Sequence, residues 1–191
     1  MTEVQGAEYL SGKFLIAMPG MGDTRFEKSV VFLCAHSEDG AMGLIVNKPS
    51  ADLQFSEMLD QLSIDVKDGV DTPDIHFGGP VEIGRGFVLH TTDYGTLEST
   101  LQVDERFSMT ATRDVLEDIA QGQGPNKALL ALGYSGWGAG QLETEISSNG
   151  WLICDALSEI VFDERNSSKW EAALRSMGVN PLLLAASAGH A

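Results

Sequence analysis

Positively charged side chains are scarce in this sequence. Twelve Lys and Arg residues stand against 28 Asp and Glu residues, which gives a formal net charge of −16 at pH 7. Binding to nucleic acid without sequence preference depends on Lys and Arg that neutralise phosphates, and docking on an anionic membrane surface needs the same residues. The charge balance therefore disfavours direct DNA binding and membrane attachment. The basic residues that could form a local patch are few and scattered: Arg25, Lys28, Lys48 and Arg85.

Cysteine and long apolar runs are also lacking. Only Cys34 and Cys154 occur, both within apolar runs. The first apolar run, residues 14–18, is too short for the core of a signal peptide, so we expect a cytoplasmic protein. Disulfides are rare in a reducing compartment, and we therefore expect two free thiols. No apolar run approaches the roughly 20 residues that span a bilayer.

The residues that are present suffice for one core. The chain has 191 residues, of which 43% are hydrophobic and 21% are charged. These values are close to the average of globular domains, and a chain of this length can bury a sizeable core. We therefore expect a single domain over residues 1–191.

The densest apolar segment covers residues 12–49. Two short apolar runs, residues 14–18 and 30–35, are separated by a glycine-rich loop, and a third, residues 41–46, follows a polar turn that ends in Gly40. Short β-branched runs bounded by turn residues are typical of buried strands. A four-residue connection that ends in glycine is typical of a hairpin. We expect the second and third runs to form one.

Strand and helix patterns are mixed along the rest of the chain. Further short runs predict strands at residues 75–77, 86–90, 101–103, 107–111, 127–132, 151–154 and 159–162. Apolar residues recur at helical spacing in residues 55–62, 115–119 and 170–177. The predicted fold class is therefore mixed α/β: a single domain with a mixed β-sheet, including hairpins, flanked by several helices.

Three local details are also expected. Asp52 is the expected N-cap of the helix near residue 55. Residues 132–141 read as a glycine-rich turn from a strand into a short helix, with Glu143 and Glu145 facing solvent. The segment after Asn180 is a last short apolar stretch.

Several separated segments follow one another in the order found in a known family: residues 17–19 with Met21 and Asp23, Phe26 with residues 29–31, residues 34–36, residues 40–44 with Asn47 and Pro49, residues 78–81, residues 136–143 and residues 188–191. On these residues the chain resembles the AlgH/YqgE family over residues 12–191. Ser135 departs mildly from the small residue expected there. The resemblance implies an α/β fold with a mixed sheet flanked by helices. Members are often labelled transcriptional regulators, and the family has no established activity that would transfer catalytic residues.

Cys34 and His36 form one candidate for chemistry. Alternate residues of a strand point to the same face, so the two side chains are expected to be neighbours. A histidine beside a thiol lowers its pKa and can create a nucleophile. The plainer alternative is a buried cysteine that packs as a small hydrophobe, with His36 bonded to the backbone. No Asp or Asn orienter is evident, although Asp23 could fold back.

Cofactor and metal signatures are missing. His36, His76, His90 and His190 show no spacing typical of metal ligands. The glycines of residues 133–140 do not fit the Gly-x-Gly-x-x-Gly dinucleotide fingerprint, because Gln141 stands at its last position. Glycine there also has a structural explanation, since it lets backbone segments pack closely. We expect no catalytic residue, cofactor or metal.

Three glycine-rich segments predict a binding surface. Sites in α/β proteins tend to lie in loops at the ends of strands, and flexible Met side chains suit adaptable contacts. The candidate surface combines residues 18–25, residues 78–81 and residues 134–138 with Gln141 and the pair Cys34 and His36. Its residues are Met18, Met21, Asp23, Arg25, Cys34, His36, Gly79, Pro80, Tyr134, Trp137 and Gln141.

Two functional hypotheses follow from different classes. The first is a non-enzymatic regulatory protein that binds a protein partner and affects gene expression indirectly if at all. The second is an enzyme or small-ligand-binding module with its site in the glycine-rich loops near Cys34 and His36. The sequence assigns neither the partner's identity nor the oligomeric state.

Overall fold

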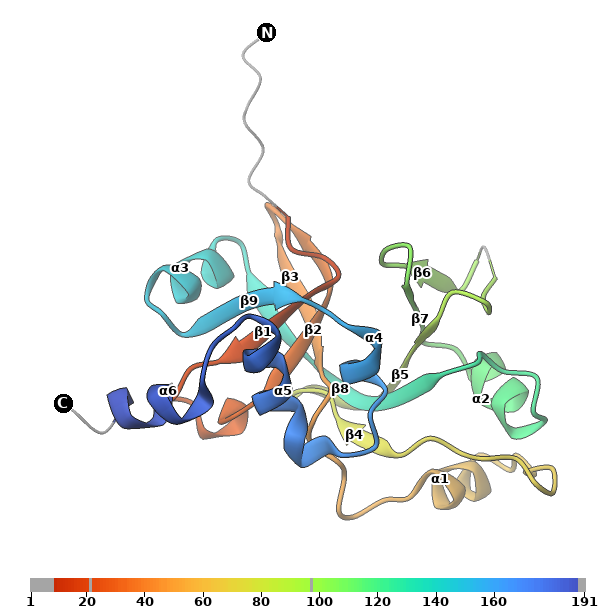
Figure 1. Ribbon diagram of the computed structural model, residues 1–191. Helices are drawn as coiled ribbons and strands as arrows, with labels where there is room; N and C mark the ends of the chain where they lie inside the picture. The colour runs from red at the N-terminus through yellow and green to blue at the C-terminus, as the bar shows by residue number, and fades with distance from the viewer. Residues whose placement is uncertain (1–8, 21, 97, 189–191) are drawn as a thin grey trace, which may run out of the picture.

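The computed structural model describes residues 9–20, 22–96 and 98–188 (Figure 1). Its strands are β1 (Lys13–Ala17), β2 (Val30–Ser37), β3 (Gly40–Ile45), β4 (Ile75–Phe77), β5 (Val81–Thr91), β6 (Thr100–Gln102), β7 (Phe107–Thr110), β8 (Ala128–Gly138) and β9 (Trp151–Asp155). Its α-helices are α1 (Phe55–Gln61), α2 (Arg113–Ala120), α3 (Gln141–Ser147), α4 (Ser158–Val161), α5 (Lys169–Ser176) and α6 (Pro181–Ala188), with short 3-10 turns η1 (Thr24–Phe26) and η2 (Asn166–Ser168).

The predicted mixed α/β fold is confirmed. One curled sheet has the strand order β6-β7-β5-β8-β3-β2-β1-β9, and β4 joins it by pairing in parallel with β8. The other pairings are antiparallel, including the predicted hairpin of β2 and β3. Among the described residues, no helix combines the length and the apolar character that crossing a bilayer requires.

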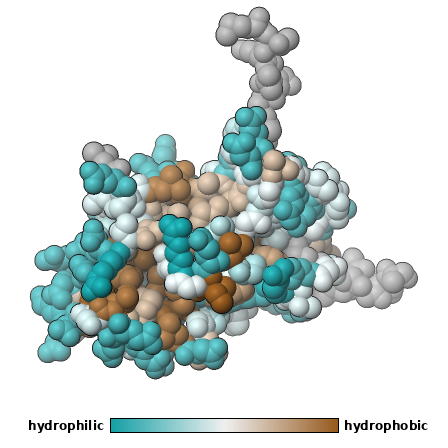
Figure 2. Space-filling view, turned by 180° about the vertical axis from the view of Figure 1, so that it is seen from behind, coloured by the Kyte–Doolittle hydropathy of each residue, from teal (hydrophilic) through white to brown (hydrophobic). Residues whose placement is uncertain are grey.

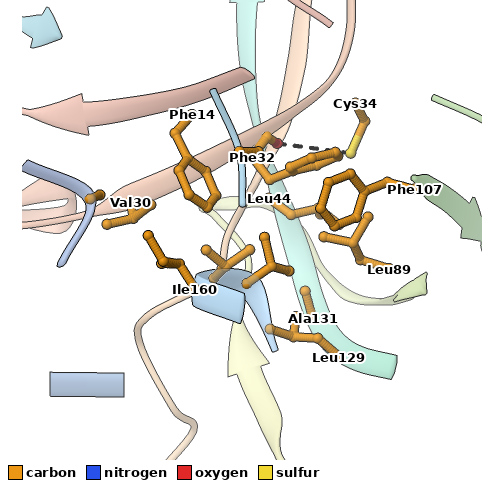
Figure 3. Close-up of a cluster of buried hydrophobic side chains, with 14 of the residues drawn as sticks. Phe14, Val30, Phe32, Cys34, Leu44, Leu89, Phe107, Leu129, Ala131 and Ile160 are labelled. Carbon is orange, nitrogen blue, oxygen red and sulfur yellow. Dashed lines mark hydrogen bonds between the residues drawn. The ribbon is translucent and has the colours of Figure 1, made fainter. Parts of the chain in front are cut away.

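Both faces of the sheet are covered by helices. On one face, α4 and α5 pack over the apolar side chains of β1, β2 and β3, in a core that includes Phe14, Phe32 and Phe107 (Figure 3). On the opposite face of these strands lies α3, whose Leu142 packs with Leu15 and flanking apolar residues. Strands buried on both faces carry continuous apolar runs rather than alternating ones, which explains the composition of residues 14–18 and 30–35.

Helices α1 and α2 cover the other half of the sheet, where β5 pairs with β8. An apolar groove of about 540 Å³ lies between them, lined by Met58, Leu62, Leu116 and Ile83 among others. Ile83 is 65% exposed. Apolar side chains are visible on this side of the molecule, bordered by polar ones (Figure 2).

Strand β8 is longer than the sequence predicts. The expected turn at residues 132–141 is wrong, because residues 133–138 continue the strand. The first half of β8 pairs with β5, and its last four residues pair with β3. Glycine is depleted in strands, so a glycine-rich segment favours a turn from sequence alone. Here its backbone completes the ladder that joins the two halves of the sheet.

Position 79 requires glycine because it lies against the backbone of β8. A Cβ atom at Gly79 would lie 2.1 Å from the carbonyl carbon of Tyr134 and 2.4 Å from the amide nitrogen of Ser135. The chain between β4 and β5 therefore passes directly over the β8 backbone, at a separation that only glycine permits.

Two further local predictions are wrong. Residues 158–161 form the short helix α4 and not a strand, because an apolar run of four residues carries too little periodicity to separate the two. The N-cap of α1 is Gln54 and not Asp52, and the Gln54 N–H donates to Glu57 Oε2 at 3.4 Å. The last apolar segment forms α6.

Candidate functional site

A cavity of about 750 Å³ lies where four segments of the chain meet. They are the loop after β1 with η1, the start of β5, the end of β8, and α3 with the turn into β9. The residues that line it are Pro19, Gly20, Gly22, Asp23, Arg25, Phe26, Pro80, Val81, Gly136, Trp137, Gln141, Glu145, Ser148, Asn149, Gly150 and Trp151. The three glycine-rich segments singled out in the sequence therefore contribute to one cavity.

Three aromatic rings form one wall of this cavity. Phe26 and Trp151 meet edge to face with their ring centroids 5.8 Å apart, and Trp137 meets Trp151 in the same way at 5.9 Å. Such edge-to-face pairs stabilise one another beyond simple burial. The pairing of β1 with β9 places Trp151 opposite Ala17, next to the loop that carries Phe26. The wall is therefore built from segments more than 100 residues apart in sequence.

Asp23 and Arg25 form a closed ion pair at the edge of the cavity. The Arg25 Nη2 lies 2.7 Å from Asp23 Oδ2, and Nε lies 3.0 Å from Oδ1. The same carboxylate also accepts the Arg25 backbone N–H at 3.0 Å and so caps η1. These contacts with Arg25 lower the pKa of Asp23, chiefly through the side-chain hydrogen bond. The charge of Arg25 is thus largely matched by its neighbour.

Glu145 and Trp151 carry polar atoms without partners. Glu145 Oε2 and Trp151 Nε1 are both buried, and neither has a hydrogen-bond partner among the described residues. Burial raises the pKa of Glu145 and Asp23 raises it further, while the Trp137 side chain acts in the opposite direction. Buried polar groups are normally paired. A group bound beside these two atoms could supply the hydrogen bonds that they lack.

A β-bulge in β2 separates the two residues of the proposed Cys34 pair. Leu33 and Ala35 pair with consecutive residues of β3, so Cys34 is an extra residue in β2. One extra residue turns every following side chain to the opposite face of the sheet. The expectation that Cys34 and His36 are neighbours is therefore wrong, because it assumed that side chains alternate between the two faces along the whole of β2.

The thiol of Cys34 is part of the core under α4 and α5 (Figure 3). It is 2% exposed and lies 3.9 Å from the Phe32 carbonyl oxygen, to which it donates. Burial raises the pKa of this thiol to about 12. Reactive cysteines need the opposite shift, and Cys34 lies outside the cavity.

His36 connects the start of the described chain to α3. Its Nδ1 accepts the Leu10 backbone N–H at 3.1 Å, so its Nε2 carries the proton that faces Glu143 Oε1 at 2.5 Å. The Tyr9 ring meets the imidazole edge to face. The hydrogen bond from His36 is the main cause that lowers the pKa of Glu143. Glu143 is exposed, as expected, and also has His36 as a partner. The same expectation is wrong for Glu145, which lines the cavity with its Oε2 buried.

The remaining predicted residues fall into three groups. Asp23, Arg25, Pro80, Trp137 and Gln141 line the cavity. Met18, Gly79 and Tyr134 lie close in sequence to lining residues and are not among them. Met21 lies outside the described residues.

Sequence reasoning missed three residues of this site. Phe26, Glu145 and Trp151 reach the cavity because β9 pairs with β1 and α3 packs on one face of these strands. Phe26 directly follows residues 18–25 and Trp151 directly follows Gly150, whereas Glu145 has no such local signal.

Comparison with known proteins assigns the family. The AlgH-like family model matches residues 14–182. The chain belongs to the AlgH-like family. An UPF0301 protein of Ruegeria pomeroyi is 60% identical over 183 residues, covering 95% of this chain and 99% of that protein. An UPF0301 protein of Cereibacter sphaeroides is 56% identical over 182 residues, covering 95% of this chain and 99% of that protein.

Two solved structures share the fold of this AlgH-like chain. The solution structure of the AlgH protein from Pseudomonas aeruginosa matches with a TM-score of 0.76 and 46% identity, covering 97% of this chain and 98% of that one. A crystal structure of a Corynebacterium diphtheriae protein matches with a TM-score of 0.71 at 22% identity, covering 94% of this chain and 92% of that one. At this identity the match shows the fold alone. The predicted membership is confirmed.

The histidines of this AlgH-like chain have separate partners. His76 Nε2 lies 3.0 Å from Asn166 Oδ1, and His90 Nε2 lies 2.8 Å from Thr110 Oγ1. No group of three potential metal ligands lies together among the described residues. Desolvation lowers the pKa of both His76 and His90. His190 lies outside the described residues.

We expect Cys34 to be unreactive in the native protein. Both thiols are free, as the sequence predicts, but burial removes Cys34 from solvent and disfavours its thiolate. Alkylation with iodoacetamide at pH 8 should modify Cys34 at least about 100-fold more slowly than in urea, because native modification needs local opening. Peptide mass spectrometry over time measures the rate. Native labelling as fast as in urea would show that the core around Cys34 is open.

Proposed function

We propose that this AlgH-like chain is a non-enzymatic binding protein of the cytoplasm, and that the cavity beside Trp151 receives a segment of a protein partner. The observation that carries the proposal is the convergence of four chain segments on one aromatic-walled cavity of about 750 Å³. Binding sites are concave, largely apolar and supplied with a few well-placed polar groups. The loop after β1, the β8 end and α3 provide the concave shape, one aromatic wall and several polar groups.

A binding role agrees better with this site than a catalytic one. Nucleophilic catalysis needs a nucleophile within hydrogen-bond reach of a base, whereas Cys34 and His36 lie on opposite faces of β2. The net charge of −16 opposes a direct contact with DNA. An effect on transcription, where there is one, would therefore pass through the bound partner.

A photo-cross-linking experiment tests this proposal. A photoreactive amino acid such as benzoyl-phenylalanine replaces Ser148 at the cavity edge in one variant and Glu117 on α2 in a control. Both positions are exposed, so the side chains tolerate the larger group. We expect irradiation in the native cell to give one discrete cross-linked partner from position 148 and none from position 117.

Two results of the cross-linking experiment would contradict binding of the partner at the cavity. Cross-linking from position 117 but not 148 would place the partner on the α1 and α2 side. Absence of any cross-linked protein from both positions would contradict a partner-binding role for the cavity.

A further inference from the structure

The cavity has a negative charge that no described residue compensates. Asp23 and Glu145 are its acidic lining residues, and Arg25 is the basic one among the described residues that line it. Arg25 holds Asp23 in a forked ion pair, with Nη2 and Nε each at hydrogen-bond distance from the carboxylate. Glu145 is therefore left as the unmatched charge of the cavity.

The two atoms without partners indicate which hydrogen-bonding groups a ligand of the cavity should carry. A carboxylate oxygen such as Glu145 Oε2 accepts hydrogen bonds, and an indole N–H such as that of Trp151 only donates them. Trp151 is 3% exposed and lines the cavity, so its N–H lacks both solvent and a described protein acceptor. A complementary ligand therefore brings a donor for Glu145 and an acceptor for Trp151.

The aromatic wall favours a cation as that donor. Lys and Arg side chains are attracted to the faces of Trp and Phe rings, most strongly where water is excluded. Phe26 already carries the Arg25 guanidinium 5.9 Å from its ring centroid, and the largely buried Trp137 and Trp151 continue this wall. An ion pair with a part-buried carboxylate such as that of Glu145 is also stronger than a hydrogen bond between neutral groups.

We propose that the cavity binds a positively charged side chain, an arginine above all, in a basic segment of the partner, with Glu145 as its counterion. This inference rests on the proposed binding function and gives the chemistry of the ligand. The guanidinium group pairs with Glu145 beside the aromatic wall. A backbone carbonyl of the same segment accepts the Trp151 N–H. The net charge of −16 attracts basic segments towards the protein before they bind.

A neutral amide is the competing ligand, because it also carries one acceptor and one donor. The probes are therefore N-acetyl-arginine methylamide and N-acetyl-citrulline methylamide, which share their shape and differ in charge. The indole N–H signals of ¹⁵N-labelled protein report binding. Trp137 and Trp151 line the cavity, whereas the Trp170 N–H donates to the Ala17 carbonyl oxygen at 2.9 Å and serves as the internal control.

We expect the arginine probe to shift the Trp151 signal in a saturable way at low salt, with the Trp170 signal constant. The citrulline probe should bind at least about 10-fold more weakly, because it lacks the charge that pairs with the carboxylate. Glu145→Gln should weaken binding of the arginine probe by a similar factor. Glu143→Gln makes the same charge change on α3 away from the cavity and should leave the affinity unchanged.

Any other result of this experiment contradicts either the cation site or the protein partner. Equal binding of both probes, or full affinity in Glu145→Gln, would contradict recognition of a cation. Failure of both probes together with cross-linking from position 148 would keep the binding function and reject the cationic ligand. Saturable binding of the arginine probe without any cross-linked protein would keep the cation site and reject the protein partner.

Discussion

Replacing Gly79 with alanine is expected to lower the free energy of unfolding by about 3 kcal/mol or more, at the upper end of single substitutions. The new Cβ atom would lie 2.1 Å from the Tyr134 carbonyl carbon and 2.2 Å from its oxygen. These are backbone atoms of a central strand, so they cannot rotate away as a side chain would. Gly79 also has a φ of +155°, which disfavours a side chain. Urea unfolding followed by circular dichroism measures the change.

Gly84→Ala is the matched control for this experiment. A Cβ atom at Gly84 meets no atom within 4 Å, and Gly84 lies in the same strand, β5, that follows Gly79. We expect its effect to stay within about 0.5 kcal/mol, as for surface substitutions generally. Equal effects of the two substitutions would contradict the close packing of residues 78–79 on β8.

Lys169 is expected to make stability depend on pH in the alkaline range. The side chain is 1% exposed, and its Nζ donates to the Val46 and Val161 carbonyl oxygens at 2.7 and 2.8 Å. Desolvation lowers the pKa of Lys169 to about 8 from the ordinary value of 10.5. Between these two values the unfolded chain binds more protons than the folded chain, so the folded state gains stability as the pH rises.

The predicted size of this gain is about 2 to 3 kcal/mol between pH 7 and pH 10, from about 1.4 kcal/mol per pH unit. The test compares the protein with Lys169→Met, which keeps an unbranched side chain and removes the titrating group. The difference in unfolding free energy between the two proteins should increase with pH in favour of lysine. A difference that is constant over this range would show that the Lys169 pKa is not lowered in the folded state.

The parts of the fold that follow local patterns could be predicted from the sequence. The β2–β3 hairpin has its apolar runs and its turn within 20 residues, and α5 has a regular apolar stripe. The extended β8 could not be predicted in the same way. Its last residues are held as a strand by pairing with β3, almost 100 residues earlier, against the local preference of glycine.

The candidate site shows the same division. Residues 18–25, 78–81 and 134–138 stood out as glycine-rich segments, and each contributes lining residues to the cavity. The single-residue bulge at Cys34 left no mark in the apolar pattern, yet it decides which face His36 occupies. Trp151 reaches the cavity through the β1–β9 register, which sequence spacing alone does not define.

Hydrogen exchange on the complex with the cross-linked partner is the most direct test of the central claim, that the cavity beside Trp151 is the binding site. The account predicts slower exchange in residues 19–20, 22–26 and 136–151, which contain the cavity's lining residues, compared with the free protein. Exchange in residues 53–62 and 110–116, which border the apolar groove, should stay the same. Slower exchange at the groove with no change around the cavity would contradict the account.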